Sequence, residues 1–343
     1  MQAVILVAGS STRTYPLTLT IPKPLLKVSN KTILEYNLEA LKDIAEEIII
    51  VVGYKKGMIK NFIKKNYSNL NIKFVEQREQ LGTGHAVSIL KDKIKNQFIL
   101  LMGDNIYSRK DVNKIAKHQY SILVKKVKNP ELFGVVKEKN GILTDIIEKP
   151  KKFVSDLVSC ALSSFDEKIF GLLEDIKKSE RREYELTDAI KKFSVKNDIY
   201  CVKSSSCFQI SYPWDLLAAD KEIRKGRNVI GKNSKINGKI KNCSIGNNCL
   251  INGNIKNSII MDTSVIDGNS IIEDSIIGRN VHFSGKIIAK NNIYSTVKNK
   301  KIKVDRLGAV IADNVKANNV VIDAGCKIWP NKKLMGKIQH DIH

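Results

Sequence analysis

The sequence predicts an α/β domain with a mostly parallel sheet, followed by a parallel β-helix. Up to about Lys225, short apolar runs rich in β-branched residues alternate with amphipathic stretches, at a spacing typical of βαβ units. After Gly226 the pattern changes, and isoleucine or valine recurs about every sixth position with Gly and Asn at the corners. A six-residue repeat whose corners tolerate left-handed backbone is typical of a parallel β-helix.

The first part is predicted to be a sheet with helices on both faces. Its opening strands are expected at Ala3–Val7, Ile48–Val52, Ile72–Val75 and Phe98–Met102. The helices between them are expected at Ile33–Leu41, Lys56–Lys65, Gly84–Leu90 and Arg109–Lys117. A more mixed region follows, with strands expected at Tyr120–Val127, Gly134–Lys137, Cys160–Phe165 and Tyr200–Lys203. Its helices are expected at Asp166–Asp175, Leu186–Val195 and Pro213–Arg224.

The repeat sets the expected division of the chain. The apolar positions of the repeat are Val229/Ile230, Ile236, Ile245, Ile251, Ile260, Ile266, Ile272 and Ile277. Each of these positions is predicted to point one side chain into a three-sided coil. The period breaks at 291–306, where a hairpin or arm is expected, and then resumes. We therefore expect two domains, 1–226 and 227–343, with an arm at about 291–306.

Composition and charge exclude several classes of protein. The chain has 343 residues and a net charge of +23, which invites a nucleic-acid hypothesis. The basic excess is spread along the chain without a dense basic tail, so specific nucleic-acid binding is not expected. The apolar runs are far shorter than the roughly 18–20 residues that cross a bilayer, so no membrane segment is expected. Six cysteines without a CxxC pair predict reduced thiols and a cytoplasmic protein.

A loop with two cations follows the first predicted strand. The sequence VAGSSTRTYPLTLTIPKPLL places a Gly/Ser/Thr turn at a strand's carboxyl end, where open α/β sheets bind ligands. Backbone N–H groups in such a turn suit phosphate oxygens, and Arg13 and Lys23 add positive charge. The Walker pattern is absent, so ATPase chemistry is not indicated. The alternative is an ordinary turn between a strand and a helix.

Further polar residues follow other predicted strands. Asp104 comes just after Phe98–Met102 and suits Mg²⁺ beside a phosphate loop, although an aspartate there is also a common helix cap. Gln77 offers a donor and an acceptor to a base edge, and Glu148 with Lys149 could bind a sugar phosphate. His85 is expected to be a structural residue at a helix start.

These motifs together resemble the sugar-1-phosphate nucleotidylyltransferase family, and more closely its archaeal-type members with a C-terminal left-handed β-helix. The resemblance covers nearly the whole chain. It is carried by G-x-x-T-R-x-x-P-L-T at 9–18, PKPLL at 22–26, ILEYNLEAL at 33–41, IIIVVGYKK at 48–56, LGTGHA at 81–86, GDN at 103–105, FGVV at 133–136, EKP at 148–150, YELTDAI at 184–190 and YPWDLL at 212–217. It implies a Rossmann-like first domain.

The resemblance also implies a reaction and roles for residues. A sugar-1-phosphate oxygen attacks the α-phosphorus of a nucleoside triphosphate, which gives an NDP-sugar and pyrophosphate. Positioning and charge neutralisation dominate such chemistry. The implied catalytic residues are Arg13, Lys23 and Asp104. The implied nucleotide-binding residues are Ala8, Gly9, Arg13, Gln77, Gly82 and Thr83. The implied sugar-phosphate residues are Gly134, Glu148, Lys149 and Ser159, and the implied Mg²⁺ ligands are Asp104 and Gln209.

The chain departs from the family pattern around one pocket. Gln209 stands where the family has a second metal-binding Asp, in a stretch where Cys207 and Ser211 replace Trp and Gly. Ser11 replaces a Gly of the phosphate loop, and Ser159–Ala161 replaces an N-A-G stretch. The metal and sugar ends are therefore altered, whereas Arg13, Lys23, Asp104 and Lys149 remain.

These departures leave two functional hypotheses. The first is a Mg²⁺-dependent sugar-1-phosphate nucleotidylyltransferase, with UTP or dTTP and a glucose-type sugar favoured. The alternative is a weakened or inactive paralogue that binds nucleotide or NDP-sugar and regulates an active partner. Acetyl transfer by the β-helix is disfavoured, because Asn314 and Ala317–Asn319 replace residues of the acetylating members. The β-helix is instead expected to assemble a homo-oligomer, a trimer or a multiple of it.

Overall fold

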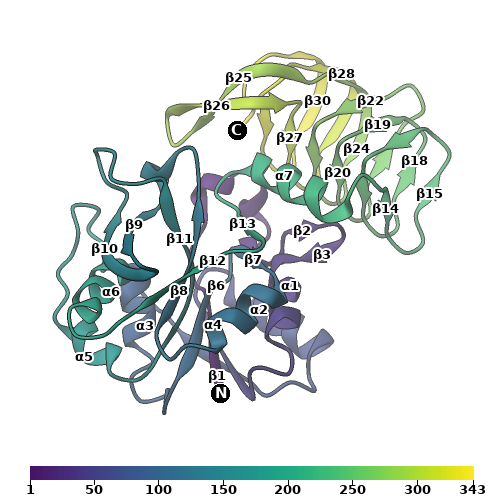
Figure 1. Ribbon diagram of the computed structural model, residues 1–343. Helices are drawn as coiled ribbons and strands as arrows, with labels where there is room; N and C mark the ends of the chain where they lie inside the picture. Colours follow the sequence, from purple (N-terminus) through teal and green to yellow (C-terminus); the bar gives the residue numbers. More distant parts are fainter. The chain divides into compact units, whose positions relative to one another are not determined.

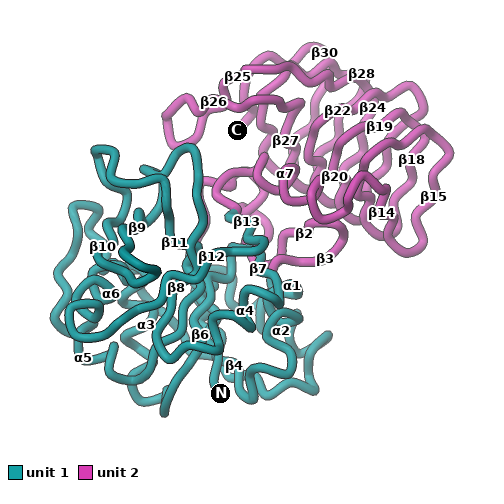
Figure 2. Tube along the Cα trace, in the orientation of Figure 1, with its two compact units in different colours: residues 1–9, 34–209 teal, residues 10–33, 210–343 magenta.

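The computed structural model describes all 343 residues, which form two compact units (Figure 2). Unit 1 contains residues 1–9 and 34–209, and unit 2 contains residues 10–33 and 210–343. Unit 2 therefore holds the β-helix together with an early segment of the chain. The domain division at Gly226 stays a prediction from the sequence.

Unit 1 is built on a nine-stranded sheet in the order β5-β4-β1-β6-β11-β8-β12-β10-β9 (Figure 1). The bounds of these strands are β1 Gln2–Val7, β4 Glu47–Val52, β5 Ile72–Glu76, β6 Phe98–Met102, β8 Ser121–Lys126, β9 Gly134–Lys139, β10 Ile142–Glu148, β11 Leu157–Phe165 and β12 Tyr200–Lys203. The first four strands in this order are mutually parallel. From β11 onward antiparallel pairs predominate. The α/β fold is confirmed, and its parallel character belongs to one half of the sheet.

The helices of unit 1 begin and end close to the predicted limits. Their bounds are α1 Ile33–Leu41, α2 Lys56–Asn66, α3 Thr83–Ser88, α4 Arg109–Ala116, α5 Ile169–Glu174 and α6 Leu186–Ser194. Strands β1, β4 and β6 have almost wholly buried side chains, as expected when helices cover both faces. A core cluster joins these strands to α3, α5 and α6 through residues such as Leu90, Phe165 and Phe193.

Three short or polar strands were not predicted from the apolar pattern. Strand β10 pairs with β9 through a turn at Asn140 and Gly141, both of which have positive φ. An Asn-Gly pair between two strand-length runs is a strong hairpin signal and could have revealed β10. Strands β7 (Asn105–Tyr107) and β13 (Cys207–Gln209) form a separate two-stranded sheet. Three-residue strands carry no periodicity that a sequence pattern can detect.

The β-helix of unit 2 is made of short parallel strands stacked coil on coil. One stack runs β14 (Val229–Ile230), β17 (Ser244–Ile245), β20 (Ile259–Ile260), β23 (Ile276–Ile277), β27 (Val310–Ile311) and β29 (Lys327–Ile328). The other two sides contain β15 Lys235–Ile236, β16 Ile240–Lys241, β18 Leu250–Ile251, β19 Asn254–Lys256, β21 Val265–Ile266, β22 Ile271–Glu273, β24 His282–Ile287, β28 Lys316–Ile322 and β30 Lys333–Ile338. Strand β24 pairs with both β21 and β22, which joins these sides into one sheet.

The predicted apolar positions of the repeat fill the interior of the coil. The side chains at these positions from Ile245 to Ile277 are fully buried. The residues of the first coil are the exceptions, with Ile230 at 49% exposure and Val229 and Ile236 partly buried, because strands β14 and β15 each have a neighbouring strand on one side only. Asparagines with φ near 55°, such as Asn242 and Asn248, occupy corners, which explains why the repeat is rich in this residue.

Two further features complete unit 2. Strands β25 (Lys290–Val297) and β26 (Lys300–Leu307) form an antiparallel hairpin, in the region where the repeat loses its period. Helix α7 (Pro213–Arg224) precedes the first coil. No helix in either unit combines the length and apolar character needed to cross a bilayer.

Candidate functional site

In unit 1 the carboxyl ends of neighbouring parallel strands form a narrow, glycine-lined edge. Ala8 and Gly9 follow β1, and Gly53 and Gly103 follow its two neighbours β4 and β6. A Cβ on Gly53 would lie 2.7 Å from the Ala8 carbonyl oxygen, so a larger residue would push the chains apart. A Cβ on Gly9 would meet nothing within 4 Å. The backbone after β1 therefore faces open space at the edge where open α/β sheets bind ligands.

The β7–β13 ladder sets Asp104 beside Gln209 in the backbone. Asp104 directly precedes β7, and Gln209 pairs with Asn105, the first residue of that strand. Asn105 is fixed in turn, because its backbone carbonyl accepts from Asn37 Nδ2 at 2.9 Å and its side-chain Nδ2 donates to the Cys160 carbonyl at 3.2 Å. The two residues expected to bind metal thus come from distant parts of the sequence, and the ladder brings their backbones close, since Gln209 lies opposite the residue that follows Asp104.

The side chain of Gln209 has one satisfied end and one unsatisfied end. Its Nε2 donates to the Ser159 carbonyl at 3.2 Å, whereas its buried Oε1 has no hydrogen-bond partner. An unpaired buried acceptor is costly, which favours a cation or a donor from a ligand at this oxygen. A carboxylate and an amide oxygen are ligands that suit Mg²⁺. The chain has no cluster of three or more His, Cys, Asp or Glu residues that could hold a metal alone. A metal here therefore needs ligand oxygens from water or phosphate as well.

The side chain of Gln77 is buried and its donors are already used. Its Nε2 lies 3.1 Å from the Gly82 carbonyl and 3.1 Å from His85 Nδ1. Because the nitrogen of a side-chain amide only donates, His85 Nδ1 acts as the acceptor of this hydrogen bond. His85 thus orients Gln77, in line with its expected structural role. The part of the Gln77 side chain that remains for a base edge is its oxygen, Oε1.

The LGTGHA turn packs against the backbone of Tyr184. Gly82 has φ of 112°, and a Cβ there would lie 2.5 Å from the Tyr184 carbonyl oxygen. Gly84 N donates to that carbonyl, and Tyr184 N donates to the Leu81 carbonyl, at 2.8 Å each. The hydroxyl of Thr83 accepts from Leu186 N at 3.1 Å. Thr83, expected at the nucleotide, therefore has a structural partner at the start of α6.

Three of the residues expected at the sugar phosphate, Gly134, Glu148 and Lys149, lie together beside α6, whereas Ser159 lies on β11. A Cβ on Gly134 would lie 3.2 Å from Glu148 Oε2 and 3.2 Å from Thr187 Cγ2, so glycine keeps this space open. Lys149 Nζ lies 3.2 Å from Glu148 Oε1. The buried hydroxyl of Thr187 has no hydrogen-bond partner. Thr187 was not singled out from the sequence, although the YELTDAI motif contains it, because an isolated threonine in a helix carries no chemical pattern.

Arg181 is a further residue of this region that sequence reasoning missed. Its guanidinium contacts Glu148 at 3.3 Å, Glu183 at 2.7 Å and Glu185 at 3.5 Å. Burial raises the pKa of Glu185, and the Arg181 charge opposes that rise. Arg181 thus offsets the negative charge beside Lys149.

The two loop cations belong to unit 2 and lie near helix α7. The Arg13 guanidinium lies 5.9 Å from the centre of the Tyr212 ring. Lys23 is 2% exposed, and its Nζ donates to the Ile210 carbonyl at 2.6 Å. Asp215 Oδ2 accepts from Ser211 N at 2.7 Å and Tyr212 N at 2.8 Å. Burial raises the pKa of Asp215, while these hydrogen bonds and the charges of Lys23 and Arg13 act in the opposite direction.

Two of the residues that depart from the family pattern have left-handed backbone. Ser11 has φ of 52° and Ala161 has φ of 54°. Both stand where the family has glycine, which adopts this conformation without the clash that a Cβ causes. Ser211 also replaces a family glycine, but its φ is not positive. The phosphate loop and the sugar end thus each contain one residue whose left-handed backbone is strained and would be relaxed by glycine.

We expect Ser11→Gly and Ala161→Gly each to raise the free energy of unfolding by about 1 kcal/mol, because each relieves left-handed strain. Urea denaturation of the two variants checks this. Ser211→Gly is the matched control and should be neutral or destabilising. Equal stabilisation by all three changes would contradict the strain interpretation.

Asp111 fixes the segment that leads into β13. Its side chain is fully buried and accepts from Ser205 N at 2.6 Å, Ser206 N at 2.9 Å and Ser204 Oγ at 3.0 Å. Burial acts to raise the pKa of Asp111, but the hydrogen bonds from Ser206 and Ser205 outweigh it, so the pKa lies below its ordinary value of 3.8. The ionised carboxylate therefore stabilises the folded chain.

We expect Asp111→Asn to lower the free energy of unfolding by about 2 kcal/mol at pH 7, the scale of hydrogen bonds to a charged group. Because the folded pKa is lowered, this stabilisation is present above pH 3.8 and is lost as the pH falls through the folded pKa. Urea unfolding from pH 7 to pH 3 measures it. A difference between wild type and variant that does not shrink in acid would contradict this assignment.

Comparison with known proteins places these features in a family. Residues 2–213 match the family model described as nucleotidyl transferase, and residues 223–342 match that of the GMPPB C-terminal domain. The chain belongs to the nucleotidyl transferase family. The recognition of sugar-1-phosphate nucleotidylyltransferase motifs in the sequence is thereby confirmed.

Three relatives illustrate where this family member stands. It is 39% identical over 244 residues to the bifunctional protein GlmU of Methanocaldococcus jannaschii, covering 70% of this chain and 57% of that protein. It is 37% identical over 200 residues to the UTP–glucose-1-phosphate uridylyltransferase AglF of Haloferax volcanii, covering 55% of this chain and 82% of AglF. The match thus spans less than two thirds of GlmU. A UDP-glucose pyrophosphorylase solved with UDP-glucose has a similar fold, with a TM-score of 0.59 and 21% identity over 65% of this chain and 98% of that one.

Proposed function

We propose that the protein is a Mg²⁺-dependent sugar-1-phosphate nucleotidylyltransferase that converts an NTP and a sugar-1-phosphate to an NDP-sugar and pyrophosphate. The observation that carries the proposal is the β7–β13 pairing, in which Gln209 lies opposite Asn105, the residue after Asp104, while the buried Oε1 of Gln209 has no hydrogen-bond partner, in a member of the nucleotidyl transferase family. UTP or dTTP and a glucose-type sugar are the favoured substrates, in line with the names of AglF and the structural neighbour.

The proposed mechanism relies on positioning and on charge. Arg13 and Lys23 bind the triphosphate and stabilise the pyrophosphate as it leaves. Ala8 and Gly9 present backbone to the phosphates, and the carbonyl oxygen of Gln77 with the Gly82 backbone contacts the base. A pre-bound sugar phosphate then attacks the α-phosphorus in line, and fixed orientation lowers the entropic cost of this step.

Mg²⁺ fits the donor set of Asp104 and Gln209, and when bound it would neutralise negative charge on the triphosphate. Because Gln209 supplies an amide oxygen in place of a second carboxylate, the chain offers the cation one negative charge fewer than the family pattern. Weaker metal binding and slower turnover are expected to follow.

The sugar end is assigned to Gly134, Glu148, Lys149 and Ser159. Lys149 binds the phosphate, and Glu148 accepts from sugar hydroxyls. The unsatisfied hydroxyl of Thr187 beside Gly134 adds a donor and acceptor for the same sugar. Unpaired polar groups in a binding site favour substrates that complete their hydrogen bonds.

A direct assay tests the proposed function. The full chain is incubated with Mg²⁺, each of the common NTPs and a panel of sugar-1-phosphates, and pyrophosphate and NDP-sugar are measured together. We expect equal amounts of the two products with at least one substrate pair. Pyrophosphate without NDP-sugar, or no turnover with any pair, would contradict the proposal.

Gln209→Asp is expected to lower the Mg²⁺ concentration needed for half-maximal activity about tenfold, because it restores a charged metal ligand. Titration of Mg²⁺ in the pyrophosphate assay measures this. Gln209→Glu is the matched control, since it adds the same charge on a longer side chain. An unchanged Mg²⁺ dependence in Gln209→Asp would remove Gln209 from the metal site.

The alternative function is a regulatory paralogue that binds nucleotide or NDP-sugar without turnover. Gln209 and the strained backbone at Ser11 and Ala161 favour it, because they alter the metal site, the phosphate loop and the sugar end, respectively. Nucleotide binding by calorimetry without product in the assay would support this alternative.

The proposal also includes a cytoplasmic location and a homo-oligomer formed through the β-helix. Light scattering of the purified chain tests the oligomeric state.

A further inference from the structure

In unit 2 a segment of the phosphate loop lies along one corner of the β-helix. Asn30 Nδ2 donates to the Ile245 carbonyl at 2.6 Å. Lys27 Nζ donates to Asp262 Oδ2 at 2.6 Å, and Thr20 Oγ1 donates to Asp313 Oδ2 at 2.8 Å. Their partners follow or belong to strands β17, β20 and β27, which lie in one parallel stack. The segment from Thr20 to Asn30 therefore contacts three levels of one stack, those of β17, β20 and β27.

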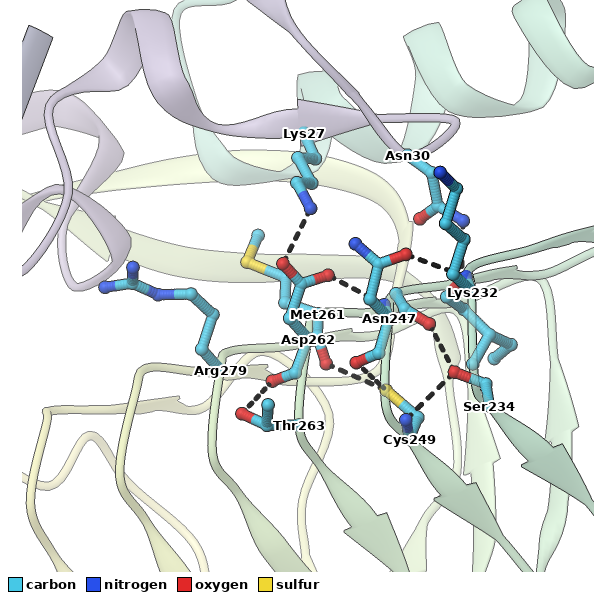
Figure 3. A network of polar contacts seen from close by, with 12 residues as sticks. Lys27, Asn30, Lys232, Ser234, Asn247, Cys249, Met261, Asp262, Thr263 and Arg279 are labelled. Atoms are coloured by element: carbon cyan, nitrogen blue, oxygen red, sulfur yellow. Dashed lines mark hydrogen bonds and ion pairs between the residues drawn. The ribbon is translucent and has the colours of Figure 1, made fainter. Parts of the chain in front are cut away.

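The two aspartates on the β-helix are held in fixed orientations. Asp262 Oδ1 accepts from Asn247 N at 2.8 Å, and Figure 3 shows its other oxygen turned toward Lys27. Asp313 is 3% exposed, and it accepts from Arg279 N at 2.7 Å and from Arg279 Nη2 at 2.6 Å. A Cβ on Gly246 would lie 2.5 Å from Asp262 Oδ1, so the corner glycine leaves no spare room around the carboxylate. Each aspartate thus presents a preset acceptor to the loop.

A third, buried contact closes the same region. Asp220 of α7 accepts from Ser29 N at 2.8 Å, from Ser244 Oγ at 2.6 Å and from Arg224 Nε at 2.6 Å. Asp220 is 1% exposed, so these hydrogen bonds form away from water and are costly to break singly. The hairpin of β2 (Lys27–Val28) and β3 (Lys31–Thr32) is thereby tied to both α7 and the β-helix.

The contacts Thr20–Asp313 and Lys27–Asp262 are called the two anchors of the loop segment. Lys23 lies between Thr20 and Lys27 in the sequence. It follows Thr20 by three residues and precedes Lys27 by four, and its Nζ contacts the Ile210 carbonyl. The turn that carries Arg13 is linked to the same segment, because Thr18 Oγ1 donates to the Ser11 carbonyl at 3.0 Å. Movement at either anchor would therefore displace both loop cations.

We propose that the β-helix is a positioning element for the nucleotide loop, and that Asp262 and Asp313 are its positioning residues. They act through Lys27 and Thr20 to hold Lys23 and Arg13 in place for a polyphosphate. The inference rests on the proposed function for the roles of those two cations. It assigns to the coil a part in nucleotide binding besides assembly. Preorganised loops bind with a smaller entropic cost, so loosening the anchors should weaken nucleotide binding.

The first test changes the loop side of each anchor and leaves the β-helix intact. Lys27→Met and Thr20→Val remove one contact each, while the Asp313–Arg279 pair stays in place. We expect each variant to raise the KM for the NTP about tenfold. The KM for the sugar phosphate should stay within about twofold, because its residues lie in unit 1. Equal changes in both KM values would contradict positioning of the nucleotide loop.

A double-mutant cycle and a matched control sharpen this test. Asp262→Asn keeps an acceptor for Asn247 N and removes the charge that pairs with Lys27, so it should weaken NTP binding by itself and add little in the Lys27→Met chain. Asp267→Asn is the control, because Asp267 is a β-helix aspartate that pairs with His282 and follows β21, outside the stack that the loop segment contacts. It should leave both KM values unchanged. Losses in Asp262→Asn and Lys27→Met that add in full in the double variant would overturn the role of Asp262.

A second measurement does not depend on turnover. Amide hydrogen exchange of peptides covering residues 10–33, in the full chain without substrate, reports how firmly the loop is held. Exchange should become at least about tenfold faster in Lys27→Met and Thr20→Val, and stay unchanged in Asp267→Asn. Unchanged exchange in both loop variants would overturn the inference. If the wild type turns over no substrate pair, the proposed function fails, and this measurement still decides whether the β-helix holds the loop.

Discussion

Replacing Asp104 by asparagine is expected to lower kcat/KM about 10³-fold, the scale of losing one group that stabilises charge in the transition state. Asp104 precedes the strand that pairs with Gln209, and it supplies the sole carboxylate of the proposed metal site. Asparagine keeps the size of the side chain and removes its charge. The pyrophosphate assay at subsaturating NTP and at several Mg²⁺ concentrations measures the effect.

Metal dependence separates this loss from a general defect. Higher Mg²⁺ should partly restore the Asp104→Asn variant, whereas thermal unfolding should match the wild type within a few degrees. Asp92→Asn is the control, because Asp92 lines a separate cavity of about 570 Å³ near the amino ends of β1, β4 and β5. Near wild-type activity in Asp104→Asn would place the metal elsewhere.

Lys23→Met is expected to reduce kcat about 10³-fold, because the ammonium is proposed to neutralise charge that develops on the polyphosphate. Methionine preserves most of the buried volume of the lysine stem. The Ile210 carbonyl would lose its donor, so a modest fall in the free energy of unfolding, about 1–2 kcal/mol, should accompany the change.

Lys23→Arg distinguishes the charge from the fold. It keeps the positive charge in a different shape and should retain more kcat than Lys23→Met. Single-turnover kinetics on both variants report the chemical step apart from product release. If Lys23→Met binds and turns over substrates like the wild type, Lys23 is a structural residue of unit 2.

The elements that were predicted well are those with a long pattern of apolar residues. These are strands β1, β4 and β6 and the repeat of the β-helix. Each of them buries a whole set of side chains, so the apolar pattern alone reveals them. Strand β10 is only partly buried and contains Thr144 and Asp145, so its turn residues were its clearest signal. The antiparallel half of the sheet depends on pairing between distant strands, which local patterns do not encode.

Sequence motifs predicted many residues of the candidate site, but not the residues that they contact in the fold. Asp104 and Gln209 were found by motif, but the ladder that makes them neighbours joins two three-residue strands about a hundred positions apart. The unsatisfied Thr187 and the Arg181 cluster depend on side chains that meet only in the fold. The anchoring of Thr20 by Asp313 joins residues 293 positions apart, and neither residue belongs to a motif.

The proposal that matters most is that Arg13 and Asp104 act on one polyphosphate. A double-mutant cycle on Mg²⁺-dependent NTP binding, with Arg13→Ala, Asp104→Asn and the double variant measured by calorimetry, tests it most directly. A shared ligand predicts that the two losses are not additive, with a coupling free energy of about 1 kcal/mol or more. Losses that add within about 0.3 kcal/mol would show independent sites and contradict a common triphosphate.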